Sequence, residues 1–240
     1  VDVYFGGAEH TLGHTLYARF FTKFFHDLGL VNYDEFALKR VQHGIVLGPD
    51  GVKMSKSKGN VINPDEQVRE YGADTVRVYL CFMMPYEATG PWSHQAIAGV
   101  YRFLKRVWEL YHRVTWNKER ETFDEDKNLV GRLNKTIKKV TDDIERIKLN
   151  TAVAAMMEFV NAWEKALNVK RLTLNVNNAK KFLQILAPFA PFLTEEIWRE
   201  VFGEKQSIHL SSWPKAQIVE DEEVVIPIQV NGKLRGTIKI

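Results

Sequence analysis

Residues 1–29 read VDVYFGGAEHTLGHTLYARFFTKFFHDLG, and this stretch decides the fold class of the first part of the chain. Val1 to Phe5 is a short β-prone run that stops at the glycine pair Gly6-Gly7. Apolar residues then recur at helical spacing at Leu12, Leu16, Phe20 and Phe24. A strand, a tight glycine turn and a helix predict an α/β fold.

The next segment extends this α/β part. Val41 to Leu47 predicts a second strand, and Pro49-Asp50-Gly51 predicts a turn after it. Ligands of α/β folds bind beyond the carboxyl ends of the strands. Motifs that follow either strand are therefore candidates for a binding site.

From Ile97 onward the apolar spacing predicts a helical bundle instead. Three amphipathic faces are formed by Ile97, Val100, Leu104, Val107, Tyr111 and Val114, by Leu129, Leu133, Ile137, Val140, Ile144 and Ile147, and by Val153, Met156, Phe159, Val160, Trp163 and Leu167. A fourth helix is predicted near Asn178, with Pro188 and Pro191 interrupting it. A last helix is predicted to start at Thr194.

The end of the chain has the pattern of a β-hairpin. Val224 to Val230 alternates, Asn231-Gly232 is a strong turn signal, and Leu234 to Ile240 supplies the return strand. An isolated hairpin is marginal in water, so we expect this one to belong to a further domain that is cut off here.

Composition predicts a folded protein of ordinary globular type. Hydrophobic residues make up 45% of the 240 residues, and 33 basic against 30 acidic residues permit a polyanionic partner without demanding one. The single cysteine, Cys81, excludes an internal disulfide and is predicted to be a core residue. No secretion signal or membrane span is evident, which favours a cytoplasmic location. The chain starts at Val1 rather than methionine, so we expect neither terminus to be a gene boundary.

The segment richest in chemistry runs from Lys53 to Asn60 and reads KMSKSKGN. Lysine on a short loop can follow the charge of a triphosphate as it moves onto departing pyrophosphate, stabilising the transition state more than the ground state. Small residues such as Gly59 let the backbone approach the ligand. A solvated lysine-rich surface loop is the alternative interpretation of the charge pattern alone.

The literal string KMSKS resembles the signature loop of the class I aminoacyl-tRNA synthetases. The continuation supports this, because residues 59–64 resemble GNVxxP and residues 71–77 resemble YGADxxR of the leucyl, isoleucyl and valyl subgroup. The opening, residues 6–20, resembles the GGxEHxxxH and LYARF of bacterial leucyl enzymes. The resemblance covers essentially the whole chain.

This resemblance implies a domain order. Residues 1–72 would form the second half of a Rossmann-like catalytic domain that carries the KMSKS loop, and residues 73–96 a connecting stem-contact segment. Residues 97–215 would form a helical domain of the anticodon-binding type, and residues 222–240 the start of a C-terminal domain. The fold class expected is thus α/β followed by all-α, with a truncated hairpin.

The resemblance also implies a ligase that activates leucine with ATP to leucyl-adenylate and transfers leucine to tRNA(Leu), with Mg²⁺ accompanying ATP. Lys53 and Lys56 are the expected catalytic residues. The residues expected to bind ATP are Gly6, Gly7, Glu9, His10, Ile45, Val46, Lys53, Met54, Ser55, Lys56, Ser57 and Lys58. His43 departs from the family pattern, but the expected adenine contacts use the main chain.

Two family features are absent from these residues. The HIGH signature lies outside them, so the chain alone should not activate leucine and needs a HIGH-bearing part or subunit as partner. The leucine-specific insertion that many bacterial enzymes carry before KMSKS is also missing between Leu47 and Lys53. His10 and His14 have the spacing of metal ligands on one helix face, but no third ligand is evident, and no metal site is predicted.

RNA binding is predicted for one edge of the first bundle helix, where Arg102, Arg106 and Arg113 could follow a phosphate backbone. A second basic edge carries Arg132, Lys135, Lys139 and Arg146. A solvated face is the alternative for each of these residues. The tryptophans Trp116, Trp163 and Trp198 are better explained as packing residues.

Two other functions stay open on sequence grounds. The chain could derive from an isoleucyl or valyl synthetase, which the GGxEH opening disfavours. It could also be a non-catalytic module that binds RNA or another subunit through its helices, which the intact KMSKS loop disfavours.

Overall fold

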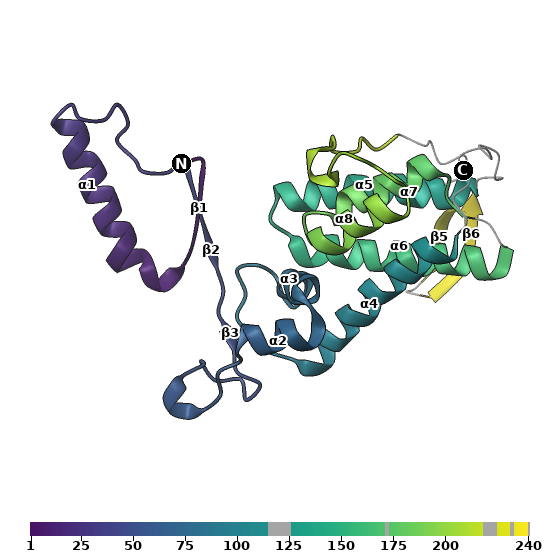
Figure 1. Cartoon of the computed structure of the whole chain (residues 1–240), viewed down its shortest axis with the longest axis horizontal. Helices are drawn as coiled ribbons and strands as arrows, with labels where there is room; N and C mark the ends of the chain where they lie inside the picture. Colours follow the sequence, from purple (N-terminus) through teal and green to yellow (C-terminus); the bar gives the residue numbers. More distant parts are fainter. Residues whose placement is uncertain (115–125, 171–172, 218–224, 231–232, 240) are drawn as a thin grey trace.

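The computed structural model describes residues 1–114, 126–170, 173–217, 225–230 and 233–239, and most of these residues are helical. Figure 1 shows a strand–helix unit at the N-terminus that stands to one side of a body of packed helices. Three two-stranded sheets are found among the described residues, and the largest parallel pair is in the N-terminal unit. The described residues contain no helix that is both long and apolar enough to span a membrane.

The N-terminal unit is one β–α–β crossover. Strands β1 (Val3–Gly7) and β2 (Lys39–His43) pair in parallel, and helix α1 (Leu16–Asp27) lies between them in sequence. The predicted strand ends at Phe5, whereas β1 continues through the glycine pair because Gly7 pairs with His43. A 3-10 turn and a π-helical turn over residues 8–15 come before α1. The α/β character of this part is therefore confirmed, with one crossover in place of a full sheet.

The predicted strand from Val41 to Leu47 is wrong as a single element. It splits into β2 and the short β3 (Val46–Leu47), which pairs in parallel with β4 (Gly90–Pro91). The strand is interrupted at Gly44, where an added Cβ would lie 1.6 Å from the carbonyl oxygen of Ala88. Only glycine permits this close approach of two backbone segments.

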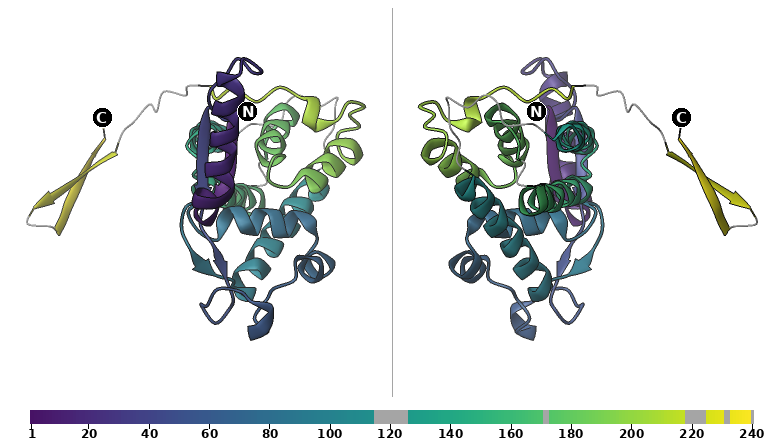
Figure 2. Two further views of the ribbon diagram at one scale, coloured as in Figure 1. Left: turned by 90° about the vertical axis from the view of Figure 1, so that its left-hand side faces the viewer. Right: turned by 90° about the vertical axis from the view of Figure 1, so that its right-hand side faces the viewer.

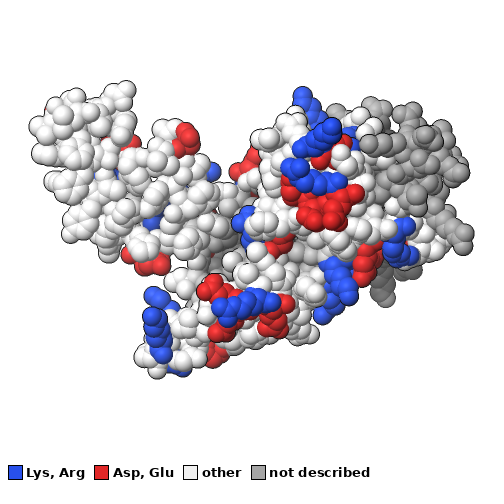
Figure 3. All heavy atoms as spheres, viewed as in Figure 1, with Lys and Arg blue, Asp and Glu red and all other residues white. Residues whose placement is uncertain are grey.

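Helix α1 has an apolar surface that nothing in these residues covers. None of its residues is buried, and the aromatic rings of Phe20 and Phe21 are 62% and 50% exposed. Its side of the molecule carries few charged side chains on the face seen in Figure 3. Contiguous exposed apolar surface of this kind marks a site of association with other chain segments or partners.

Two short helices connect the lysine loop, residues 53–60, to the helical body. Helix α2 (Pro64–Tyr71) is capped by Asn63, whose side chain accepts from the amide of Asp65 at 3.0 Å. Gly72, with φ +85°, separates α2 from α3 (Ala73–Phe82). Helix α3 packs against helices of the body through its buried face.

The helical body holds the core of the molecule. Its five long helices are α4 (His94–Arg113), α5 (Lys127–Glu145), α6 (Leu149–Lys170), α7 (Val176–Leu186) and α8 (Pro191–Glu200). The predicted apolar faces are buried except at Ile144, Ile147 and Leu167, which are half-buried. Tyr111, Trp163 and Phe182 are fully enclosed. Trp198 is buried as predicted, Cys81 is half-buried against the core, and Trp116 lies outside the described residues.

Helix α8 begins three residues before the predicted start at Thr194. Pro191 occupies its first turn, where the missing amide hydrogen costs nothing. The carboxylate of Asp74, from α3, accepts from the amides of Phe192 and Leu193 at 3.4 and 2.7 Å. The cap is thus supplied by a residue far away in sequence, which local helix signals could not reveal.

The predicted C-terminal hairpin is present. Strands β5 (Val225–Val230) and β6 (Lys233–Lys239) pair antiparallel, with an irregularity between Ile228 and Gln229. The predicted turn residues 231–232 lie outside the described part. Both views of Figure 2 show the hairpin standing apart from the helices.

Candidate functional site

The lysine loop is braced by one side chain, that of Asn60. Its Oδ1 accepts from the amide of Ser55 at 2.9 Å, and its Nδ2 donates to both carboxylate oxygens of Asp50 at 3.2 and 3.1 Å. The loop closes at Gly59 in the left-handed conformation with φ +65°. A hydrogen bond from the amide of Val52, together with Asn60, lowers the pKa of Asp50, so this brace is charged at neutral pH.

The lysines of the loop are available to an anion. Lys53, Lys56 and Lys58 are exposed, and no carboxylate within the described residues forms an ion pair with any of them. The 3-10 turn at Lys56–Lys58 holds the last two on one short segment. The hydroxyls of Ser55 and Ser57 lie 2.8 Å apart, so each has capacity left for a further hydrogen bond.

The carboxyl end of β1 places a charged group over a glycine. A Cβ on Gly7 would lie 2.3 Å from Oε2 of Glu9, so the Glu9 carboxylate folds back over the strand end. A hydrogen bond from its own amide lowers the pKa of Glu9, and the charges of His10, His43 and Lys53 act in the same direction. Of these charges, that of Lys53 has the smallest effect.

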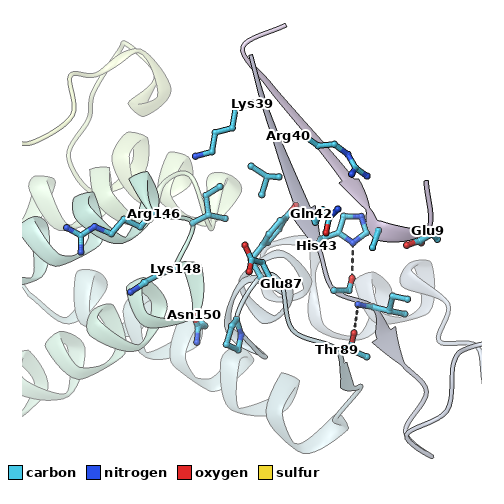
Figure 4. Close-up of a pocket in the computed structure, with 17 residues that line it drawn as sticks. Glu9, Lys39, Arg40, Gln42, His43, Glu87, Thr89, Arg146, Lys148 and Asn150 are labelled. Atoms are coloured by element: carbon cyan, nitrogen blue, oxygen red, sulfur yellow. Dashed lines mark hydrogen bonds between the residues drawn. The ribbon is translucent and has the colours of Figure 1, made fainter. Parts of the chain in front are cut away.

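A cavity of about 820 Å³ opens between β2 and the helical body. It is lined by Ala8, Glu9, Lys39, Arg40, Val41, Gln42, His43, Gly44, Ile45, Pro85, Tyr86, Glu87, Thr89, Arg146, Ile147, Lys148 and Asn150. Figure 4 shows the β-strand residues on one side of this space and the α5–α6 turn on the other. Of the residues predicted to bind ATP, Glu9 and Ile45 line the cavity, whereas the lysine loop lies outside its lining. Arg146, predicted on the second basic edge, also lines it.

The main chain around Ile45 is partly occupied. Its amide donates to Oγ1 of Thr89 at 3.2 Å, and its carbonyl accepts from the amide of Gly90 at 3.2 Å. Val46 pairs with Gly90 in a parallel ladder, where the polar groups of alternate residues point to opposite sides of the strand. The backbone of Val46 therefore faces away from β4.

Several residues of the cavity carried no sequence signal for this site. Lys39 and Arg40 belong to β2, Glu87 to the segment before β4, and Arg146 and Lys148 to the turn after α5. Arg40 donates to the Gly7 carbonyl at 2.9 Å and to Oγ1 of Thr11 at 3.0 Å, which fixes the end of β1. The residues that meet here are more than a hundred positions apart, so spacing could not bring them together.

The three arginines predicted to bind RNA share one edge of α4, facing α6. Arg106 forms an ion pair with Glu164 and also donates to Oδ1 of Asn161 at 2.6 Å. Arg113 donates to Oδ1 of Asn168 at 3.2 Å. Arg102 is exposed, and its side chain forms no hydrogen bond or ion pair within the described residues. The edge therefore holds one committed arginine and two that stay largely accessible.

The two histidines with metal-ligand spacing, His10 and His14, lie between β1 and α1. No group of three or more histidine, cysteine or acidic residues suited to a metal occurs within the described residues. The His14 ring stacks on Tyr4, with 5.7 Å between the ring centroids, and His10 lies in the 3-10 turn after β1.

Two family models match the chain. Residues 28–92 match tRNA synthetases class I (I, L, M and V), and residues 126–240 match the anticodon-binding domain of tRNA ligase. The first match contains the lysine loop, and the second contains α5 to α8 and the hairpin.

Curated relatives align over the whole chain. A leucine–tRNA ligase of Bdellovibrio bacteriovorus is 46% identical, and one of Herpetosiphon aurantiacus is 43% identical. In each case the alignment covers 100% of this chain and 30% of the relative, so the chain spans under a third of their length. Among solved structures, the ternary complex of Agrobacterium radiobacter K84 agnB2 LeuRS, tRNA and LeuAMS matches with TM-score 0.85 and 34% identity, covering 100% of this chain and 32% of that chain.

Proposed function

We propose that this chain belongs to the class I tRNA synthetases, as a segment homologous to leucine–tRNA ligases. It would supply the lysine-loop half of an ATP site and a tRNA-binding helical body. The whole protein would join leucine to tRNA(Leu) through leucyl-adenylate in the cytoplasm. Leucine is proposed as the amino acid because the two relatives described above are leucine–tRNA ligases. A HIGH-bearing part would provide the other wall of the active site.

The observation that carries this proposal is the loop at 53–60, whose lysines are exposed and unpaired while its backbone is braced by Asn60. A triphosphate matches a group of cations that has no internal counter-charge. Lys56, with Lys53 and Lys58 assisting, would stabilise the negative charge that moves onto pyrophosphate. Mg²⁺ would accompany the nucleotide, as the resemblance to class I synthetases implies.

The strand ends would hold the adenosine side of the nucleotide. Val46 is the better of the two predicted adenine contacts, because both main-chain polar groups of Ile45 already have partners. Glu9, charged and folded over Gly7, would accept hydrogen bonds from a ribose hydroxyl or an α-amino group. His10 follows Glu9 on the same 3-10 turn and would also form a hydrogen bond with the ribose or the α-amino group.

The test is leucine-dependent exchange of pyrophosphate into ATP by the full-length protein that contains this chain. Exchange that requires leucine, and that isoleucine and valine do not support equally, would uphold the proposal. Exchange with isoleucine or valine as the preferred amino acid would assign the chain to another branch. Intact tRNA binding without any exchange would favour a non-catalytic module.

A further inference from the structure

The cavity between β2 and the α5–α6 turn contains cations that the proposed ATP site does not use. Lys39 comes from one wall, and Arg146 and Lys148 come from the other (Figure 4). All three are exposed side chains. The remaining basic side chain, Arg40, is committed to Gly7 and Thr11.

These three cations differ from Lys138 and Lys139 of the nearby helix α5, which have acidic partners. Lys138 pairs with Asp142 at 2.8 Å, and Lys139 pairs with Asp143 at 2.5 Å. No ion pair joins Lys39, Arg146 or Lys148 to a carboxylate within the described ranges of the chain. Positive charge at the cavity is therefore left for an outside group.

The α5–α6 turn is built to hold its two cations in place. Ile147, between them, adopts φ +57°, which is strained for a β-branched residue. The amide of Lys148 donates to the carbonyl of Asp143 at 2.7 Å, and the buried Asp143 carboxylate accepts from Oγ1 of Thr151 at 2.6 Å. Strain that surrounding bonds maintain is typical of functional turns.

Two acidic groups limit where an anion can lie in the cavity. Glu9 sits at the end of β1, and Figure 4 shows the Glu87 side chain reaching into the space between the two walls. An anion is repelled from the Glu9 end and attracted to the mouth, where Lys39 faces the turn. An extended polyanion that passes along the mouth fits this arrangement better than a small ion held deep in the cavity.

We propose that the mouth of this cavity, formed by Lys39, Arg146 and Lys148, binds the sugar-phosphate backbone of RNA. The inference deepens the proposed function and rests on it, because the RNA would be the tRNA that the enzyme charges. It adds a binding surface on the opposite end of α6 from Arg113, whose partner Asn168 lies near the helix C-terminus.

The experiment measures affinity of the full-length protein for transcribed tRNA(Leu) over a range of salt concentrations. The triple variant Lys39→Gln, Arg146→Gln and Lys148→Gln should lose three phosphate contacts. The slope of log affinity against log salt should then fall by roughly 2.1 to 2.7, at about 0.7 to 0.9 per contact.

The matched control replaces Lys165, Lys205 and Lys215 by glutamine. These lysines are also exposed and lie outside the cavity lining, so the formal charge change is the same. Lys165 is about 24 Å along α6 from Leu149 at 1.5 Å per residue. The control should keep the slope of the unaltered protein.

Equal slopes in the triple variant and the control would overturn the inference. If the triple variant fails to fold, Lys148→Gln alone replaces it, since its side chain is exposed and forms no hydrogen bond or ion pair within the described residues. The expected change is then about 0.7 to 0.9. Leucine-dependent exchange by the unaltered protein reports the proposed function separately. Exchange with an unchanged RNA slope would refute the RNA surface only, and a lowered slope without exchange would refute the ligase only.

Discussion

Helices α1 and α4 have similar apolar spacing in sequence but opposite fates in the structure. Helix α1 buries none of its residues, whereas α4 buries Ile97, Val100, Phe103, Leu104, Val107, Leu110 and Tyr111. An amphipathic pattern predicts that a helix has a face to cover, and says nothing of where the cover comes from. In α4 the cover is other helices of this chain. For α1 we expect it to come from residues outside these 240.

The difference in burial corresponds to a difference in proposed role between the helical body and the N-terminal unit. The helical body holds most of the buried core of the described residues, and its proposed role is to bind RNA. The N-terminal unit and the lysine loop carry the predicted catalytic groups on short strands with little core of their own. Substitutions in the two regions should therefore affect different measurements.

The largest effect should come from matched phenylalanine truncations. Phe182→Ala removes a fully buried ring from the helical body and should lower the free energy of unfolding by about 3 to 5 kcal/mol. Phe20→Ala removes a ring that is 62% exposed and should cost the 240-residue chain under about 0.5 kcal/mol. Chemical denaturation measures both.

The same Phe20→Ala change sharpens the comparison in the full-length protein. If other residues cover α1 there, the cost of Phe20→Ala should rise towards that of a core truncation. A cost that stays small in both contexts would show that α1 is a solvent-facing helix, and the expected cover would be wrong.

The second effect is catalytic. Lys56→Ala in the full-length protein should slow leucine-dependent pyrophosphate exchange by about a hundredfold to a thousandfold, because a donor to the transition state is lost. The melting temperature should stay nearly unchanged, since the side chain is exposed and unpaired. Lys165→Ala, on α6, is the control for charge removal. Exchange at the unaltered rate would show that Lys56 does not act in the reaction.

The third effect tests the contact that joins the loop-bearing helices to the body. Asp74→Ala removes the acceptor for two amides at the start of α8 and should lower stability by about 1 to 2 kcal/mol. Asp74→Asn keeps one acceptor oxygen and should recover part of this loss. Thermal unfolding that is identical for all three proteins would show that Asp74 does not act as a cap.

How much of this could be predicted from sequence depended on whether the cause was local. The helices of the body were predictable because each carries its own apolar period, and the hairpin because Asn231-Gly232 lies between alternating runs. The early start of α8 was missed because its cap, Asp74, is more than a hundred residues away. The break at Gly44 was missed because it depends on the backbone of Ala88 crossing that point.

The candidate site divides in the same way. The lysine loop is one contiguous segment, so its sequence motif alone could mark it as a candidate site. The motif includes Asn60, whose side chain braces the loop. The cavity beside β2 joins residues from four distant segments, and no spacing in the sequence relates Lys39 to Lys148. The ion pair of Arg106 could not be predicted either, because its partner Glu164 lies on another helix. RNA binding by Arg106 stays a prediction.

The smallest effect separates Arg102 from Arg106 within the predicted RNA edge. Arg102→Gln removes an exposed charge that has no ion-pair partner among the described residues. The salt slope of tRNA affinity should therefore fall by about 0.7 to 0.9 while the melting temperature stays constant. Arg106→Gln breaks the pair with Glu164, whose side chain is 26% exposed, and should cost up to about 1 kcal/mol of stability. Its effect on the slope should be weaker, because an arginine held by a carboxylate displaces fewer counterions from RNA. Restoring stability with Glu164→Gln in the Arg106→Gln background would confirm that the cost comes from the unpaired acid. If Arg106→Gln changes the slope as much as Arg102→Gln does, the ion pair opens when RNA binds, and the whole edge of α4 contacts the backbone.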